Sequence, residues 1–332
     1  MSSSPAATSL AGASPVSQAN TLVMRVIGAC ALAHLINDLI QAVLPAIYPM
    51  LKLNYGLSFA QIGLITLTFQ LTASLLQPWV GYHTDRHPKP WLLPAGSLCT
   101  LVGILMLAFV GSFPAILLAS ALVGVGSSTF HPEASRIARL ASGGRYGLAQ
   151  STFQVGGNAG TAFGPLLAAA IIIPYGQGNV AWFGLFAAFA IVVLYGLSRW
   201  YRHHLTLFKL KRGGVATHGL SARRVKFALL ILALLVFSKY FYMASFTSYF
   251  TFFLIEKFDL SVASSQLYLF LFLGAVAAGT FFGGPIGDRI GRKAVIWFSI
   301  LGVAPFSIAL PYADLFWTGV LSMIIGLSLI HI

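Results

Sequence analysis

The chain has 332 residues, of which 58% are hydrophobic and only 8% charged, and its mean hydropathy is +0.84. A water-soluble domain carries about 25% charged residues, so this composition excludes a soluble enzyme and indicates an integral membrane protein. The formal net charge of +13 raises the possibility of a nucleic-acid partner. The distribution of the basic residues along the chain tests this possibility.

The chain begins with a polar segment and continues with apolar stretches. Residues 1–22 contain no charged side chain and lack the basic start and cleavage site of a secretory signal, so we interpret them as a disordered cytoplasmic tail. Ten later stretches are apolar and long enough to cross a bilayer core of about 30 Å. Their approximate limits are 25–51, 58–83, 91–111, 114–136, 146–173, 180–200, 226–255, 262–286, 293–311 and 315–332.

A charged pattern, Gly-x-x-x-Asp-Arg, occurs at 81–86 and again at 284–289, each time between two apolar stretches. Internal duplication of this kind is typical of transporters, in which two related bundles rock about a central site. We predict an N-terminal six-helix bundle over 23–200, a basic cytoplasmic linker over 201–225 and a second bundle over 226–332. The repeat offset places partners of helices five and six beyond residue 332, so the second bundle is expected to be incomplete and the chain truncated.

Most of the 20 lysines and arginines fall in alternate loops. These loops contain Arg86 and Lys89; Arg136, Arg139 and Arg145; the segment 199–226; and Arg289, Arg292 and Lys293. This asymmetry follows the positive-inside rule and predicts a cytoplasmic N-terminus. The basic charge therefore indicates orientation and proximity to lipid headgroups, and leaves no case for nucleic acid.

Two sets of residues resemble motifs of the major facilitator superfamily. The first is the pair of charged segments, with Gly81, Asp85, Arg86, Lys89, Gly284, Asp288, Arg289 and Arg292. The second is Gly160, Gly164 and Pro165 in helix five, similar to the antiporter motif of the drug exporters, although Ala168 and Ala169 replace the usual glycine pair. From the residues alone, the glycines are packing devices and the proline bends or weakens the helix.

More narrowly, His34-Leu-Ile-Asn37-Asp38 and the segments 124–136 and 237–244 resemble superfamily exporters that confer resistance to the phosphonate antibiotic fosmidomycin. The resemblance covers essentially all of the chain after the tail. It implies an all-α integral membrane fold of two pseudo-repeated six-helix bundles in the bacterial inner membrane. It also implies a functional monomer that expels a small anionic drug in exchange for protons.

The residues bear on three alternatives to this function. Direct ATP drive is unsupported, because no Gly-x-x-x-x-Gly-Lys-Ser/Thr loop occurs. An uptake symporter for a sugar or an organic phosphate uses the same fold, but the antiporter-like Gly-Pro pair argues against it. An integral-membrane enzyme using His131 and Glu133 is less favoured, because the sequence has no zinc-ligand pattern. We predict no metal and no cofactor, with the proton as coupling ion.

Polar groups inside the apolar helices are the candidates for transport, because an ionisable side chain in the bilayer costs about 3 kcal/mol. In helix one, His34, Asn37, Asp38 and Gln41 recur every three or four residues and form one polar stripe. Lys239 occupies the corresponding depth of helix seven. Asp38 and Lys239 can pair in an empty carrier, either as transport residues or as a buried structural ion pair.

Helix four supplies His131, Glu133 and Arg136 near its cytoplasmic end. Glu133 and Arg136 share a face, so they can form a local ion pair, whereas the alternative makes Glu133 or His131 a proton acceptor. Tyr242 is a candidate for lining the cavity, with ordinary lipid or helix contact as the alternative.

The charged segments 81–89 and 284–293 have a physical interpretation as a cytoplasmic latch. Asp85 and Asp288 are expected to pair with nearby arginines or to lie at a helix N-terminus. Either contact would hold neighbouring helices together while the inner side of the carrier is closed.

Overall fold

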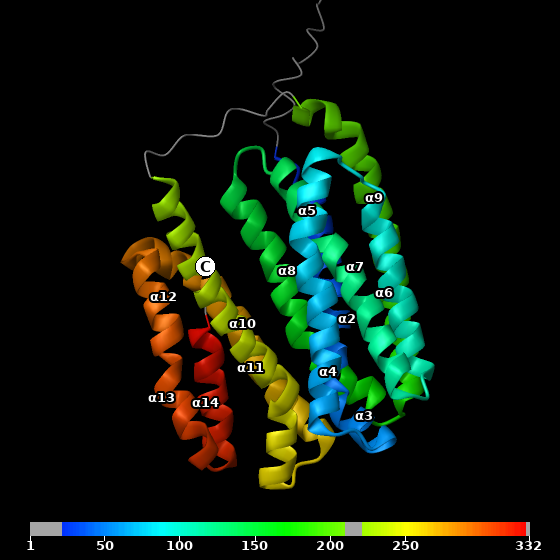
Figure 1. Ribbon diagram of the computed structural model, residues 1–332, viewed down its shortest axis with the longest axis vertical. Coiled ribbons are helices and arrows are strands. Elements are labelled where there is room, and N and C mark those ends of the chain that lie inside the picture. Colours follow the sequence, from blue (N-terminus) through cyan, green and yellow to red (C-terminus); the bar gives the residue numbers. More distant parts are fainter. Residues whose placement is uncertain (1–21, 210–220, 330–332) are drawn as a thin grey trace, which may run out of the picture.

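The computed structural model describes residues 22–209 and 221–329, apart from the side chains of 206–209, 284–288 and 292. Within these ranges every regular element is helical (Figure 1). The N-terminal half contains α2 (Met24–Ala46), α3 (Tyr48–Tyr55), α4 (Phe59–Gln70), the π-helical η1 (Leu71–Leu75), α5 (Leu76–Arg86), α6 (Leu92–Phe109), α7 (Phe113–Leu140), α8 (Tyr146–Leu167), the π-helical η2 (Ala168–Ile172), the 3-10 helix η3 (Gln177–Trp182) and α9 (Phe183–Lys209). The C-terminal half contains α10 (Ala222–Phe258), α11 (Val262–Ile290), α12 (Arg292–Leu301), α13 (Val303–Ala309), the 3-10 helix η4 (Leu310–Tyr312) and α14 (Leu315–Ser328).

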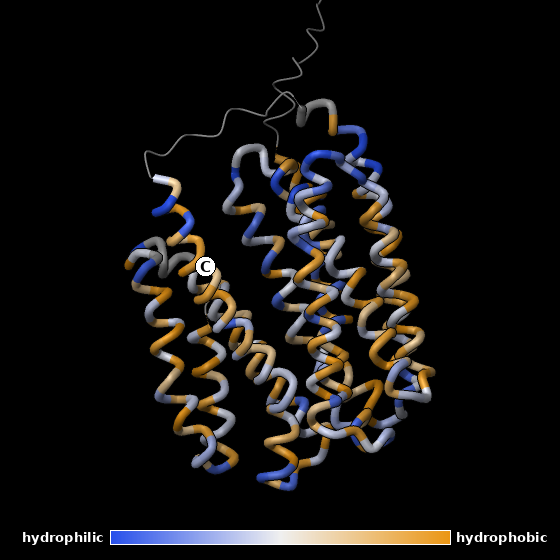
Figure 2. The backbone as a smooth tube through the Cα atoms, viewed as in Figure 1, coloured by the Kyte–Doolittle hydropathy of each residue, from blue (hydrophilic) through white to orange (hydrophobic). Residues whose placement is uncertain are grey.

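The predicted apolar stretches correspond to these helices. In the described part of the chain, nine helical segments are long and apolar enough to cross a membrane, and α14 is a shorter apolar helix. Figure 2 shows hydrophobic residues along the lengths of the helices and hydrophilic residues concentrated near their ends. The all-α membrane fold predicted from composition and helix length is confirmed.

The first predicted stretch, 25–51, is broken in the structure. Pro45 lies in the last turn of α2, and Pro49 lies in the first turn of α3. Because proline has no backbone N–H, neither residue can donate to the helical ladder, and the chain forms two helices around Ile47.

The boundaries near the charged segments also differ from the prediction. Asp85 and Arg86 form the last turn of α5, and α11 continues to Ile290 before Gly291 turns the chain with a φ of +89°. The signature is therefore largely a helix end and not a loop. Likewise, α9 extends to Lys209, past the predicted boundary at 200, while the tail 1–21 and the linker residues 210–220 lie outside the described ranges.

Glycines bring α8 against α2. A Cβ built on Gly156 would overlap the carbonyl of Ala31, and one built on Gly160 would overlap the carbonyl of Leu35. Small residues at four-residue spacing permit this backbone approach, which agrees with the packing role inferred for Gly160 and Gly164. Pro165 lies two residues before the end of α8, where the helix passes into the π-helical η2.

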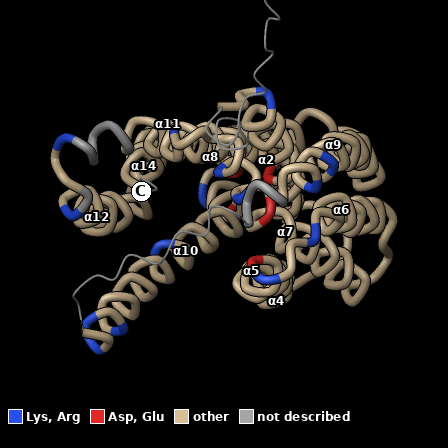
Figure 3. The backbone as a smooth tube through the Cα atoms, turned by 90° about the horizontal axis from the view of Figure 1, so that it is seen from above, with Lys and Arg blue, Asp and Glu red and all other residues tan. Residues whose placement is uncertain are grey.

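The two halves contact each other near the end of the molecule that lies far from the N-terminus of α10 (Figure 1). Thr66 of α4 lies 3.1 Å from Ser248 of α10, measured between the side-chain oxygens. Gln266 Nε2 of α11 donates to the carbonyl of Ala46 at 2.7 Å. Toward the N-terminus of α10, this helix diverges from the N-terminal half (Figures 1 and 3), and no residue of its most apolar window is buried in the described structure. In the described part of the chain, the halves therefore meet at one end and diverge at the other.

Candidate functional site

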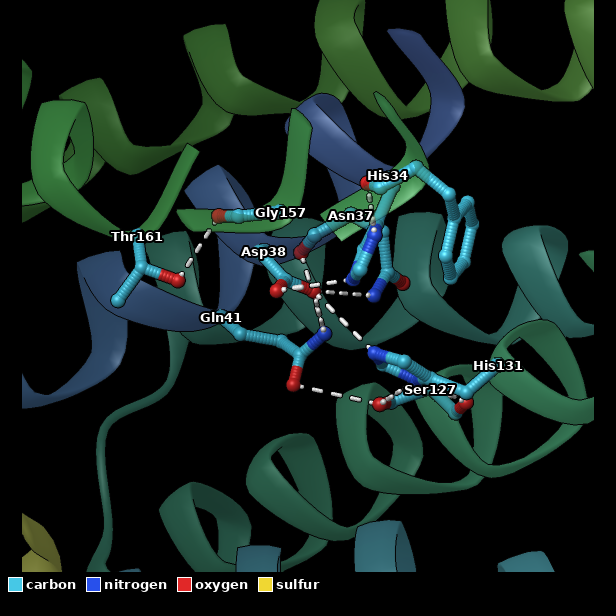
Figure 4. A network of polar contacts seen from close by, with 9 residues as sticks. His34, Asn37, Asp38, Gln41, Ser127, His131, Gly157 and Thr161 are labelled. Carbon is cyan, nitrogen blue, oxygen red and sulfur yellow. Dashed lines mark hydrogen bonds and ion pairs between the residues drawn. The ribbon is translucent and has the colours of Figure 1, made fainter. Parts of the chain in front are cut away.

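Asp38 in the interior of α2 is the centre of a polar network (Figure 4). Its Oδ2 lies 3.2 Å from His34 Nε2, and its Oδ1 lies 3.5 Å from Nε2 of His131 on α7. Asn37 and Gln41 donate to Oδ1 at 3.0 and 3.2 Å. The polar stripe predicted in helix one therefore converges on a single carboxylate, and His131 joins it from another helix.

Three further residues complete the network, and sequence analysis missed their contacts. Ser127 of α7 donates to Gln41 Oε1 at 3.2 Å. The backbone carbonyl of Phe153 on α8 lies 2.8 Å from His34 Nδ1, and the two rings stack with their centroids 4.1 Å apart. Gly157 lies against His34 and Asp38, where any side chain would overlap the imidazole. The only feature of the sequence that could have indicated these contacts is a glycine on a helix next to the polar stripe.

His34, Asp38 and His131 could also surround a cation. Their ligand atoms all lie within 4.8 Å of one another, a grouping that can accommodate protons or a metal ion. The sequence did not predict this grouping, because the histidines come from α2 and α7 without a recognisable ligand spacing.

Arg136 forms a second charged cluster near the end of α7. Its guanidinium pairs with Glu133 Oε1 and Asp85 Oδ1, and donates to Thr84 Oγ1 at 3.1 Å. Asp85 lies near the negative end of the α5 dipole, so a cation there is electrostatically favourable. The predicted pairing of Asp85 with an arginine is thus observed, but at a helix C-terminus and not at an N-terminus.

The structure divides the charged residues of α7 between these two clusters. His131 faces Asp38, whereas Glu133 is fully buried against Arg136. The local ion pair of Glu133 and Arg136 is therefore observed. Glu133 Oε2 has no hydrogen-bond partner among the described residues, which leaves this carboxylate only partly satisfied.

The pairing of Lys239 with Asp38 and the lining of the cavity by Tyr242 stay predictions. Lys239 is partly exposed on α10, and the ion pairs of Asp38 in the described structure are with the two histidines. The Tyr242 hydroxyl lies 2.8 Å from Ser307 Oγ on α13, inside the C-terminal half.

The other residues of the charged segments have separate surroundings. Arg86 stacks 3.6 Å above the Tyr82 ring, and Gly81 faces Pro132 across ordinary contact distance. Lys89 lies in the connection between α5 and α6, and Arg289 is exposed. The side chains of Asp288 and Arg292, and the surroundings of Gly284, lie outside the described part of the structure.

Residues 30–331 match the family model described as Major Facilitator Superfamily. The chain is 61% identical over 304 residues to the fosmidomycin resistance protein of Escherichia coli (strain K12), covering 92% of this chain and 75% of that protein. It is 40% identical over 294 residues to the uncharacterized MFS-type transporter YfnC of Bacillus subtilis (strain 168), covering 88% and 71%.

Solved transporter structures share the fold. A bacterial homologue of the human lysosomal transporter Spinster, in an inward-facing and occupied conformation, superposes with a TM-score of 0.72 at 18% identity, covering 92% of this chain and 71% of that one. A D-xylose-proton symporter gives a TM-score of 0.67 at 15% identity, covering 92% and 80%. At these identities the likeness concerns the fold alone.

Proposed function

Because the chain belongs to the major facilitator superfamily, we propose that it is a secondary transporter that exports fosmidomycin, and similar small organic anions, in exchange for protons. The proposed substrate rests on the 61% identity, over 92% of the chain, to a fosmidomycin resistance protein. The observation that supports proton coupling is the buried cluster of Asp38 with His34 and His131.

The proposed transport site lies between the first helices of the two halves, α2 and α10. In transporters with this kind of repeat, substrate and coupling-ion sites lie near the membrane midplane at the repeat interface. Asp38 is the coupling carboxylate, while Lys239 and His131 supply charge-assisted hydrogen bonds to the anionic phosphonate. Arg136 is assigned to the latch and not to the drug, because its guanidinium already pairs with Glu133 and Asp85.

The proposed orientation places the N-terminus in the cytoplasm of a bacterium and the helices in its inner membrane. Figure 3 shows Lys and Arg at the ends of α5, α9, α10 and α12 that face the viewer. Under the positive-inside rule this end is cytoplasmic. The contacts between the halves would then lie on the periplasmic side, which supports an inward-facing carrier. The pairing of Asp85 with Arg136 joins two helices of the same half, so we infer that this part of the cytoplasmic latch is already formed before the cytoplasmic side closes.

Inside-out membrane vesicles test substrate and direction together. Vesicles containing the protein, with an interior acidified by respiration, should accumulate labelled fosmidomycin, and collapsing the proton gradient should stop the accumulation. Asp314→Asn is a matched control, because Asp314 caps α14 in the C-terminal half and asparagine caps helices equally well. Accumulation only in right-side-out vesicles would identify an uptake symporter, and accumulation independent of the gradient would refute proton coupling.

A further inference from the structure

Backbone contacts determine which nitrogen of each histidine at Asp38 carries hydrogen. His34 Nδ1 lies 2.8 Å from the Phe153 carbonyl oxygen, and His131 Nδ1 lies 3.1 Å from the Ser127 carbonyl oxygen. A carbonyl oxygen can only accept, so each Nδ1 must donate. A neutral imidazole has a single N–H, and each neutral ring would therefore present a lone pair at Nε2.

That lone pair conflicts with the position of Asp38. His34 Nε2 lies 3.2 Å from Asp38 Oδ2, which is the distance of a hydrogen bond between two groups that would both be acceptors if His34 were neutral and Asp38 ionised. A proton between them removes the conflict, either as imidazolium with carboxylate or as neutral imidazole with carboxylic acid. The contact of His131 with Oδ1 is longer, at 3.5 Å, and Oδ1 already accepts from Asn37 and Gln41.

We propose that His34 and Asp38 jointly hold one proton in this inward-facing conformation, and that Gly157 is the positioning residue that permits their contact. This inference rests on the proposed proton-coupled transport and identifies where the proton resides. The structure then corresponds to the carrier after the proton has arrived and before it is released to the cytoplasm.

The surroundings of the pair are consistent with a proton that is held and then released. The His34 side chain is only 2% exposed, whereas those of Asp38 and His131 are 20% and 26% exposed, so the route to water passes the carboxylate and His131. The titratable groups with described contacts to Asp38 are His34 on α2 and His131 on α7. The neighbouring helix α10 adds two more titratable residues, Lys239 and Tyr240. From α8 the facing groups are Gly157 and the Phe153 carbonyl, neither of which titrates.

Gly157 controls the distance between the two partners. A Cβ at this position would overlap the His34 imidazole and lie 2.8 Å from Asp38 Oδ2. A methyl group there must push the ring and the carboxylate apart. Gly147 provides a matched control on the same helix, because a Cβ there meets nothing within 4 Å.

Proton counting on the purified, drug-free protein in lipid nanodiscs tests the assignment. Between about pH 5 and 8, where histidine-linked sites titrate, the wild type should take up one proton more than His34→Gln. Asp38→Asn and the double variant should lose that same single proton, because one proton belongs to both residues. Gly157→Ala should bind it about tenfold more weakly, which moves the midpoint about one pH unit lower, while Gly147→Ala should match the wild type.

Four outcomes would overturn the assignment. In the first, His34→Gln takes up as many protons as the wild type. In the second, the proton losses of the two single variants add up in the double variant. In the third, His131→Gln alone removes the proton. Uptake that changes on treatment with EDTA or Zn²⁺ would also overturn it, by showing a metal site. Because the count uses no drug, an intact count without fosmidomycin export would refute only the proposed function. Proton-driven export without the shared proton would refute only this inference.

Discussion

The two charged clusters joined by α7 use the same acid chemistry with different bases. Asp38 faces histidines, which gain and lose a proton near neutral pH, whereas Asp85 and Glu133 face Arg136, which stays protonated in proteins. The first cluster is suited to exchanging a proton and the second to a permanent ion pair. A carboxylate inside a membrane protein therefore takes its role from its partner base.

Exposure separates Asp38 from Glu133 in the same way. The Asp38 side chain is 20% exposed and that of Glu133 is fully buried. A carboxylate that must exchange protons needs access to water, whereas a carboxylate sealed beside arginine would leave an uncompensated buried charge if its partner were removed. Substitutions in the two clusters should consequently affect different steps of transport.

The largest effect is expected from neutralising Asp38. Asp38→Asn should lower proton-driven fosmidomycin export by about 100-fold or more, because asparagine cannot take up and release the proton. Glu133→Gln should lower export less, because Arg136 keeps Asp85 as a partner. Export by equal amounts of each variant in vesicle membranes measures the contrast. If only Glu133→Gln abolished export, the coupling site would lie in the second cluster.

Lys239→Met extends the comparison to the C-terminal half. Loss of a charge-assisted hydrogen bond to the drug costs about 1.5–3 kcal/mol, so binding should weaken by about 10- to 100-fold and export should fail. Methionine keeps much of the apolar stem. Drug binding to the purified protein measures the effect, with Lys226→Met as the control, because Lys226 is exposed on the same helix.

A double variant tests the structural alternative for Lys239. The described ion pairs of Asp38 are with histidines, so Asp38→Asn combined with Lys239→Met should not recover export. Restored export would show that the two residues form a purely structural pair in another conformation, and would remove Lys239 from the proposed site.

Asp85→Asn should separate rate from affinity. Asparagine can still accept a hydrogen bond from Arg136 but has no charge, so the latch weakens while the drug site is untouched. We expect about tenfold slower turnover with binding changed by less than about twofold. Both quantities should be measured on one preparation, and Asp288→Asn is expected to behave alike from the sequence repeat. Weakened binding at an unchanged rate would place Asp85 at the substrate.

The smallest effect is expected at Tyr242, which belongs to neither cluster. Tyr242→Phe removes the hydroxyl that contacts Ser307, so the expected loss is about 1 kcal/mol of stability with export unchanged. Thermal melting in detergent and vesicle export measure the two effects. A strong loss of export with unchanged melting would return Tyr242 to the transport site.

Sequence reasoning succeeded where local spacing carries the information. The apolar lengths predicted the helices, and the three- and four-residue steps from His34 to Gln41 predicted the stripe. It could not place His131 beside Asp38, because that contact depends on how α7 packs against α2. Nor could it foresee the proton at His34, which follows from the position of a backbone carbonyl on α8. The sequence placed Lys239 in the site because it lies at the same depth in the membrane as Asp38. Depth alone does not determine which partner a side chain contacts in a given conformation.

The glycine contact between α8 and α2 determines which helices can slide past each other. Where Gly156 and Gly160 meet the carbonyls of Ala31 and Leu35, no side chain intervenes that could change rotamer to absorb a displacement. On its other side α8 meets α11 through larger side chains such as Phe163 and Phe270, whose ring centroids are 6.2 Å apart. The first pair of helices therefore behaves as one rigid body that carries Asp38 with it. We expect any sliding between the two halves to fall between α8 and α11.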